Sequence, residues 1–142
     1  MLWLRSVATI LLLTVVALCG CSRQNTLTSN DIRSEVLAVT SFASQIEMFI
    51  DFVRQGRATK LFVQGHTKQL ERELSRNAQQ LDDSIPSLET QRDFQKCKDT
   101  VGLLRGELSL IPQLINNDAG LQTEREHIEK IRERLTNERS PS

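Results

Sequence analysis

The chain has 142 residues, with 18 Lys plus Arg against 18 Asp plus Glu, so its formal net charge is zero. This even balance argues against nucleic acid as a partner, because proteins that bind nucleic acid concentrate basic residues on one surface. Five Phe, one Trp and no Tyr also leave little aromatic surface for stacking bases or sugars. The length fits a single domain that can bury a modest core.

The first elements in chain order are a short basic start and an apolar run. Arg5 is the one charged side chain before Val7–Leu18, a run made mostly of Leu, Val, Ile and Ala. This pattern is typical of an export signal, whose apolar core has ~7–15 residues. A membrane-spanning helix needs ~20 apolar residues. However, no charge interrupts residues 6–22, so an uncleaved membrane anchor stays open as the alternative.

The residues Leu18, Cys19, Gly20 and Cys21 end this run and resemble the lipobox of bacterial lipoproteins, although Cys19 departs from the commonest residue at its position. The resemblance implies a signal peptide over residues 1–20, cleavage between Gly20 and Cys21, and acyl chains such as palmitate on Cys21. Several acyl chains would anchor the mature protein to a membrane effectively permanently. Since residue 22 is Ser rather than Asp, the resemblance implies the outer membrane, with the domain facing the periplasm.

Residues 21–28 are predicted to be the lipidated cysteine and a polar tether, followed by a first helix. Thr28, Ser29 and Asn30 are suited to cap that helix. Apolar residues then recur at alternating steps of four and three up to Gly56, which is expected to end the helix. The members of this seam are Ile32, Val36, Val39, Ala43, Ile46, Ile50 and Val53.

Three further helical segments are predicted, with turns between them. Pro86 is expected to begin the third helix, because proline fits the first helical turn but cannot extend a preceding helix. Pro112 lies inside the third apolar pattern and predicts a break near Leu110, and residues 116–120 have the composition of a turn. The predicted bounds are about Ala58–Asp83, Pro86 to the break near Leu110, and Leu121 to about Asn137.

The predicted fold is all-α, an antiparallel up-down helical bundle of three to four helices over residues 29–139, with a disordered tail at 140–142. Short connections between helices force neighbours to run antiparallel. No stretch alternates with period two, so strands are not expected. The alternative is a longer hairpin, in which the first two helices merge through Gly56 and dimerisation buries the apolar seam.

The two histidines, His66 and His127, are weighed as metal ligands. Glu124 precedes His127 by three residues, as in one quarter of a di-iron carboxylate site. Such a site needs a second Glu-x-x-His pair, and Val63 stands three residues before His66. We therefore expect no metal ligands and no cofactor, with Glu124 and His127 on a solvated helix face.

Cys97 falls within the apolar pattern of the third helix and is expected to be a buried core thiol, with an interchain disulfide as the alternative. Gly102 and Gly106 are expected to let a neighbouring helix approach closely. The acidic residues Asp51 and Asp82-Asp83 lack a second element of an acid-base site. We therefore predict no catalytic residues and no enzymatic activity.

The leading functional hypothesis is a lipid-anchored, non-catalytic interaction or structural module of the bacterial cell envelope. Its predicted contact with an envelope protein, or with a second copy of itself, uses Phe42, Phe49 and Phe52, which widen the apolar stripe of the first helix, together with Phe62 of the second. Ordinary core packing is the alternative role for these four residues. A bundle that binds a cofactor or ligand, and an envelope lipoprotein without a defined ligand, are the competing functions.

Overall fold

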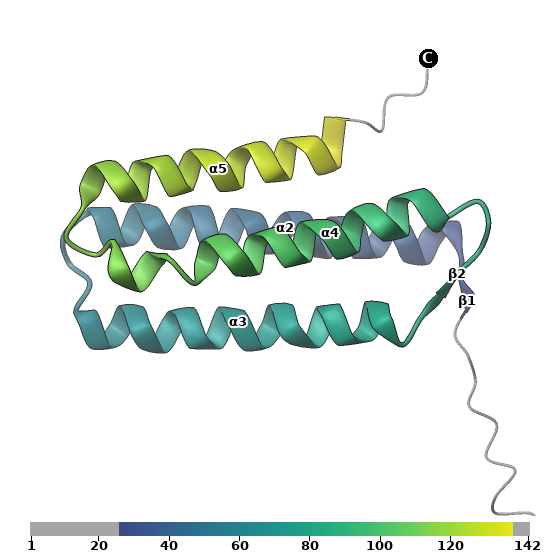
Figure 1. The fold of residues 1–142 in the computed structure, drawn as a ribbon, viewed down its shortest axis with the longest axis horizontal. Coiled ribbons are helices and arrows are strands. Elements are labelled where there is room, and N and C mark those ends of the chain that lie inside the picture. Colours follow the sequence, from purple (N-terminus) through teal and green to yellow (C-terminus); the bar gives the residue numbers. More distant parts are fainter. Residues whose placement is uncertain (1–25, 138–142) are drawn as a thin grey trace, which may run out of the picture.

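The computed structural model describes residues 26–137, which form an antiparallel bundle of four helices (Figure 1). Successive helices run up, down, up and down, so the predicted all-α bundle is confirmed. The first two helices are separate, which excludes the merged hairpin. The bounds are α2 Ser29–Arg54, α3 Lys60–Asp82, α4 Gln91–Leu108 and α5 Asp118–Asn137.

The apolar core runs along the middle of the bundle, with α2 as its central helix. This helix packs most extensively against α5, also contacts α4, and meets α3 least. The seam predicted from the sequence of α2 is buried throughout. Each fully buried Leu or Ile contributes roughly 1.5–3 kcal/mol relative to an exposed position. Residues of this kind are Ile46, Ile50, Leu74, Leu81, Leu104, Leu108, Ile111, Leu121 and Ile128.

Within residues 26–137, α2 is the one helix long and apolar enough to cross a membrane by length and composition alone. The other helices of the bundle cover its apolar seam. Glu47, Asp51 and Arg54 flank this seam, and each is ion-paired to a residue of α5. A helix whose apolar seam is covered by its neighbours and flanked by ion pairs to one of them is the core helix of a bundle.

The start of α2 is fixed by a reciprocal pair of hydrogen bonds between Thr28 and Asp31. The Asp31 backbone N–H donates to the Thr28 hydroxyl over 3.3 Å, and the Thr28 N–H donates to the Asp31 carboxylate over 2.8 Å. Hydrogen bonding to Thr28 lowers the pKa of Asp31. This capping box satisfies two otherwise unpaired donors, and it shows that Thr28 is the one of the three candidate caps that begins the helix.

Two short strands at one end of the bundle correct the sequence analysis. Thr26–Leu27 (β1) pairs in parallel with Ile85–Pro86 (β2), although no strand was expected. Pro86 therefore does not begin the third helix; the Ser87 N–H donates to the Thr90 hydroxyl over 2.9 Å, and α4 starts only after this turn. Leu27 is buried, so the end of the segment predicted as a tether belongs to the fold.

The helix ends predicted at Gly56 and Pro112 are present, whereas the start of the last helix differs. Gly56 adopts a φ of 71° just after α2, a conformation that glycine reaches without steric cost. The break predicted near Leu110 is present, because α4 stops at Leu108 and a 3-10 turn, Ile111–Gln113, follows. By contrast α5 starts at Asp118, before the predicted Leu121, since the Asn117 side chain accepts a hydrogen bond from the Gly120 N–H over 3.0 Å.

Candidate functional site

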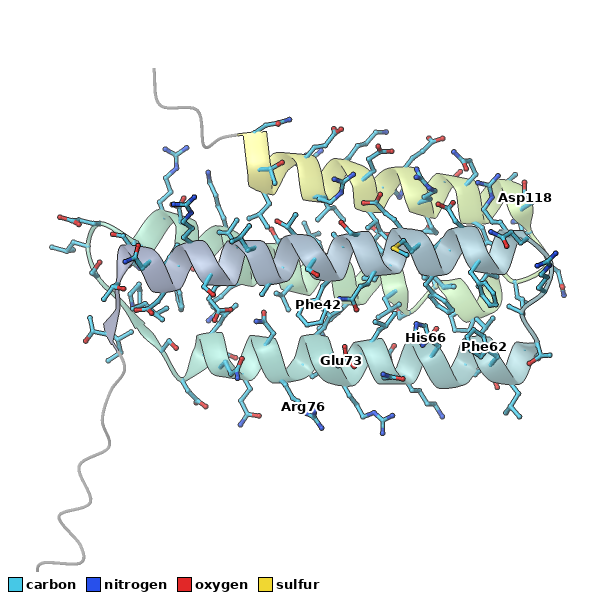
Figure 2. The ribbon with its side chains drawn as sticks, turned by 180° about the vertical axis from the view of Figure 1, so that it is seen from behind. Phe42, Phe62, His66, Glu73, Arg76 and Asp118 are labelled. Atoms are coloured by element: carbon cyan, nitrogen blue, oxygen red, sulfur yellow. The ribbon has the colours of Figure 1, made fainter. Side chains whose placement is uncertain are left out.

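A groove lies between the C-terminal half of α2 and the N-terminal half of α3. We call it the aromatic groove; its volume is about 340 Å³, and Figure 2 shows Phe62 and His66 lying between the two helices. Met48, Phe52 and Phe62 remain 72%, 39% and 46% exposed, respectively. No Asp, Glu, Lys or Arg lines this groove. Its lining residues are Gln45, Met48, Phe49, Phe52, Phe62 and His66.

The rings of the aromatic groove hold one another in place. Phe49 is buried and meets the His66 ring edge-on at 4.6 Å between centroids. Phe62 lies 5.4 Å from Phe52 at 62°, and it stacks with His66 at 5.7 Å and 6°. Such ring pairs contribute ~0.5–1.5 kcal/mol beyond their buried area. The apolar surface of the groove is therefore formed before any ligand arrives.

Three of the four Phe residues predicted as partner contacts meet in the aromatic groove. Phe42 does not: it is half-buried and packs against the core two turns before Phe49. Gln45, Met48 and His66 also line the groove and were not predicted. The sequence contained the pattern that identifies them, because Gln45, Met48, Phe49 and Phe52 follow the i, i+3, i+4, i+7 spacing of one helix face. His66 lies one turn after Phe62.

A second cluster joins α4 to α5 through Glu107, Glu124 and His127, whose possible ligand atoms all lie within 4.8 Å of one another. We call it the Glu-Glu-His cluster. Glu124 is only 8% exposed, and one of its carboxylate oxygens has no hydrogen-bond partner. Burial, reinforced by the neighbouring Glu107, raises the pKa of Glu124 to about 7. The Nδ1 atom of His127 lies 3.8 Å from the Glu107 carboxylate.

The expectation that Glu124 faces solvent is wrong, whereas His127 is exposed as expected. Glu124 continues the buried pattern of α5, in which Leu121, Glu124, Ile128 and Ile131 follow steps of three and four. That spacing was visible in the sequence. The contribution of Glu107 was not, because it depends on how α4 packs against α5.

Ion pairs line the contact between α2 and α5. Asp51, expected to be an isolated surface charge, accepts from Arg125 over 2.9 Å, and Glu47 accepts from Arg132 over 2.7 Å. Arg54 donates to Asp118 over 2.8 Å and lowers the pKa of that carboxyl. These pairs fix the position of α5 along α2, which is a structural role.

Gly102 and Gly106 do not allow the close helix approach that was expected. A side chain added at either position would meet no atom within 4 Å, because both residues face an open groove of about 760 Å³ between α3 and α4. Lys68, Arg72 and Arg105 also line this groove, together with a single acidic residue, and give it a basic character.

Cys97 is fully buried, as predicted for a core thiol. Its burial argues against the alternative of an interchain disulfide, since a second chain could reach the sulfur only if the bundle opened. Asp82 ends α3 and forms an ion pair with Lys98 over 2.6 Å. Burial in the core gives Cys97 a structural role, and the ion pair with Lys98 gives Asp82 one.

The comparisons with known proteins add no family to this description. No protein-family model matches the sequence. The comparisons with curated proteins and with solved structures gave no match either. The lipobox residues Leu18–Cys21 lie outside the described residues. Function therefore has to be argued from the chemistry of the sites and from the sequence.

Proposed function

We propose that this protein is a lipid-anchored, non-catalytic module of the bacterial cell envelope that binds an apolar helix of a partner protein in its aromatic groove. The observation that carries the proposal is the groove itself, an open and preformed aromatic surface without charge. The membrane anchor is inferred from the lipobox resemblance at Leu18–Cys21, and the outer membrane from Ser22.

The composition of the groove favours one kind of ligand. Its accessible surface is mainly apolar, and Met48 and Phe52 from α2 face Phe62 from α3 across it. An amphipathic helix that places apolar residues at i, i+3 and i+4 fills such a groove, and the absence of charge favours an uncharged contact face. Core packing explains the buried Phe49, but it does not explain why Met48 and Phe62 remain open to solvent.

The position of the groove suits a tethered receptor. The described chain begins at Thr26, at the strand end of the bundle, whereas the groove lies toward the opposite end (Figure 1). About 20 helical residues separate Ser29 from Phe49, which is ~30 Å at 1.5 Å per residue. An anchor attached before Thr26 would therefore hold the strand end of the bundle, and not the groove, next to the membrane.

The groove is tested by photocrosslinking in cells. A benzophenone side chain replaces Met48 in one strain, and Leu88, which is 97% exposed and lies two residues after β2, in the control strain. We expect one discrete adduct from position 48, lost when Phe62→Ser is added, and no such adduct from position 88. Equal adducts from both positions, or none from position 48, would contradict the proposal. An adduct with twice the mass of the chain would identify a second copy as the partner.

The anchor is tested separately by metabolic labelling with a clickable fatty acid. We expect label on the native protein in the outer-membrane fraction, and none on Cys21→Ala. Absence of label on both, with the full-length mass retained, would instead indicate an uncleaved membrane helix. This result would overturn the lipid anchor without affecting the crosslinking test of the groove.

A further inference from the structure

We propose that Glu107, Glu124 and His127 form a binding site for one divalent transition-metal ion, such as Zn²⁺, held between α4 and α5. The site is separate from the aromatic groove, which lies between α2 and α3. The inference therefore does not rest on the proposed partner binding.

The three side chains offer a suitable ligand set. Two carboxylate oxygens and one imidazole nitrogen are ligands that Zn²⁺ accepts at ~2.0–2.2 Å, and in a tetrahedral site neighbouring ligand atoms lie about 3.4 Å apart. The observed separations of at most 4.8 Å therefore have to shorten by up to about 1.4 Å, which rotation of the exposed His127 and half-buried Glu107 side chains can supply. A doubly charged cation also balances two carboxylates. Three protein ligands leave a coordination position for water, and the nitrogen ligand favours Zn²⁺ over Mg²⁺ or Ca²⁺.

The burial of Glu124 is the second, independent indication of a ligand. Its carboxylate is more than nine-tenths buried beside the core residues Leu121 and Ile128, and one oxygen has no hydrogen-bond partner. A buried acceptor without a partner destabilises a fold. Its carboxylate lies within 4.8 Å of both the Glu107 carboxylate and a ring nitrogen of His127. An ion at that point would complete its coordination.

The site has access to solvent. A surface groove of about 240 Å³ adjoins it and is lined in part by Glu107 and His127, so an ion can enter without unfolding the bundle. Lys130 and Arg134 line the same groove and repel a cation. Binding therefore depends on direct coordination by the three ligands. Long-range attraction of the ion to an acidic surface cannot explain it, because the surface here also carries two basic residues.

The test is a Zn²⁺ titration of the full-length chain, purified in detergent and stripped of metal, in competition with a chromophoric chelator at about pH 7.5. Every sample carries Cys19→Ser and Cys21→Ser, because free thiols bind Zn²⁺ themselves. We expect one ion per chain, with the affinity reduced about tenfold or more in both Glu124→Gln and His127→Gln. Glu126→Gln, an exposed carboxylate on the same helix, is the matched control and should bind like the parent chain.

Thermal unfolding supplies a second readout. Zn²⁺ should raise the Tm of the parent chain and of Glu126→Gln, because a ligand that binds only the folded state stabilises it, but not the Tm of Glu124→Gln. The metal-free Glu124→Gln chain should remain folded, since the amide replaces a buried carboxyl without loss of volume. Absence of Zn²⁺ binding, or equal affinity in all four chains, would overturn the proposal.

Discussion

The contact of α2 with α5 and its contact with α3 differ in how completely they are closed. Toward α5, buried apolar residues are flanked by cross-helix ion pairs such as Glu47–Arg132 and Asp51–Arg125. Toward α3, the helices touch less, and the aromatic groove separates their ends. A hydrogen bond of 2.9 Å from Asn77 to Glu35 joins α2 to α3 nearer the strand end.

This difference indicates that the two sides of α2 have different roles. The side of α2 that faces α4 and α5 supplies most of the burial that stabilises the bundle. The side that borders the groove keeps aromatic surface in contact with water. Open apolar surface of this kind is typical of interaction sites. Substitutions on the closed side should therefore change stability, and substitutions on the open side should change binding.

The largest expected effect is the loss of a core residue on the closed side. Ile50→Ala removes a fully buried side chain of α2 and should lower the free energy of unfolding by about 2–5 kcal/mol. Met48→Ala, two residues earlier but largely exposed, should change it by only about 0.5 kcal/mol or less. Chemical denaturation of both variants checks the contrast. Equal losses would show that the groove side also forms part of the core.

Glu124, which is buried in α5, should lower the stability of the folded protein near neutral pH, and the size of this effect depends on pH. Its folded pKa of about 7 lies above the ordinary value of 4.5, so the folded state keeps a proton that the unfolded state loses. The stability from Glu124 is thus fully present below pH 4.5 and is lost as the pH rises through 7. In a metal chelator, Glu124→Gln should gain up to about 3 kcal/mol relative to the parent chain between these limits.

Denaturation of both proteins at several pH values measures this difference, which cancels the titration of shared groups that are remote from Glu124. Glu107 and His127 face Glu124, so the difference reports the titration of the cluster as a unit. A stability difference that does not change between pH 4.5 and pH 7 would show that Glu124 ionises normally in the folded protein. A fall in stability of the parent chain that the variant reproduces would assign the pH dependence to another group.

The third effect concerns the ion pairs of the closed side. Arg132→Ala leaves the buried Glu47 carboxylate without its partner at 2.7 Å, and we expect a loss of about 1–2 kcal/mol. Arg54→Ala should lose less, because its partner Asp118 lies largely in water. Unfolding experiments at low and high salt check this order. A larger loss for Arg54→Ala would contradict the assignment of Glu47 to the buried part of the interface.

The fold could be predicted from the sequence because its signals are local. The steps of three and four in α2 identify the residues that are buried, and Gly56 and Pro112 mark real interruptions. The error at Pro86 has a physical reason. A proline fits a short strand as well as a first helical turn, and the pairing that decides between them involves Thr26–Leu27, nearly sixty residues away.

The candidate sites were predicted only in part, because each combines residues from two helices. The sequence predicted Phe49, Phe52 and Phe62 as contacts, but only the packing of α3 beside α2 shows that they share one groove with His66. Similarly, the spacing in α5 places Glu124 and His127 one helical turn apart, whereas Glu107 belongs to α4. Distances between helices are absent from a periodic pattern, so the third ligand could not be inferred.

The sharpest test of the comparison is Phe62→Ala, which should combine a modest effect on stability with a large effect on binding. Phe62 is 46% exposed, and its removal forfeits ring contacts with Phe49, Phe52 and His66, a loss of about 1–2 kcal/mol. If the open side exists for binding, the adduct formed from position 48 should nevertheless disappear. Photocrosslinking and denaturation of the same variant decide the matter together. A folded protein that still forms the adduct would place the partner outside the groove, whereas a large loss of stability would mean that Phe62 belongs to the core.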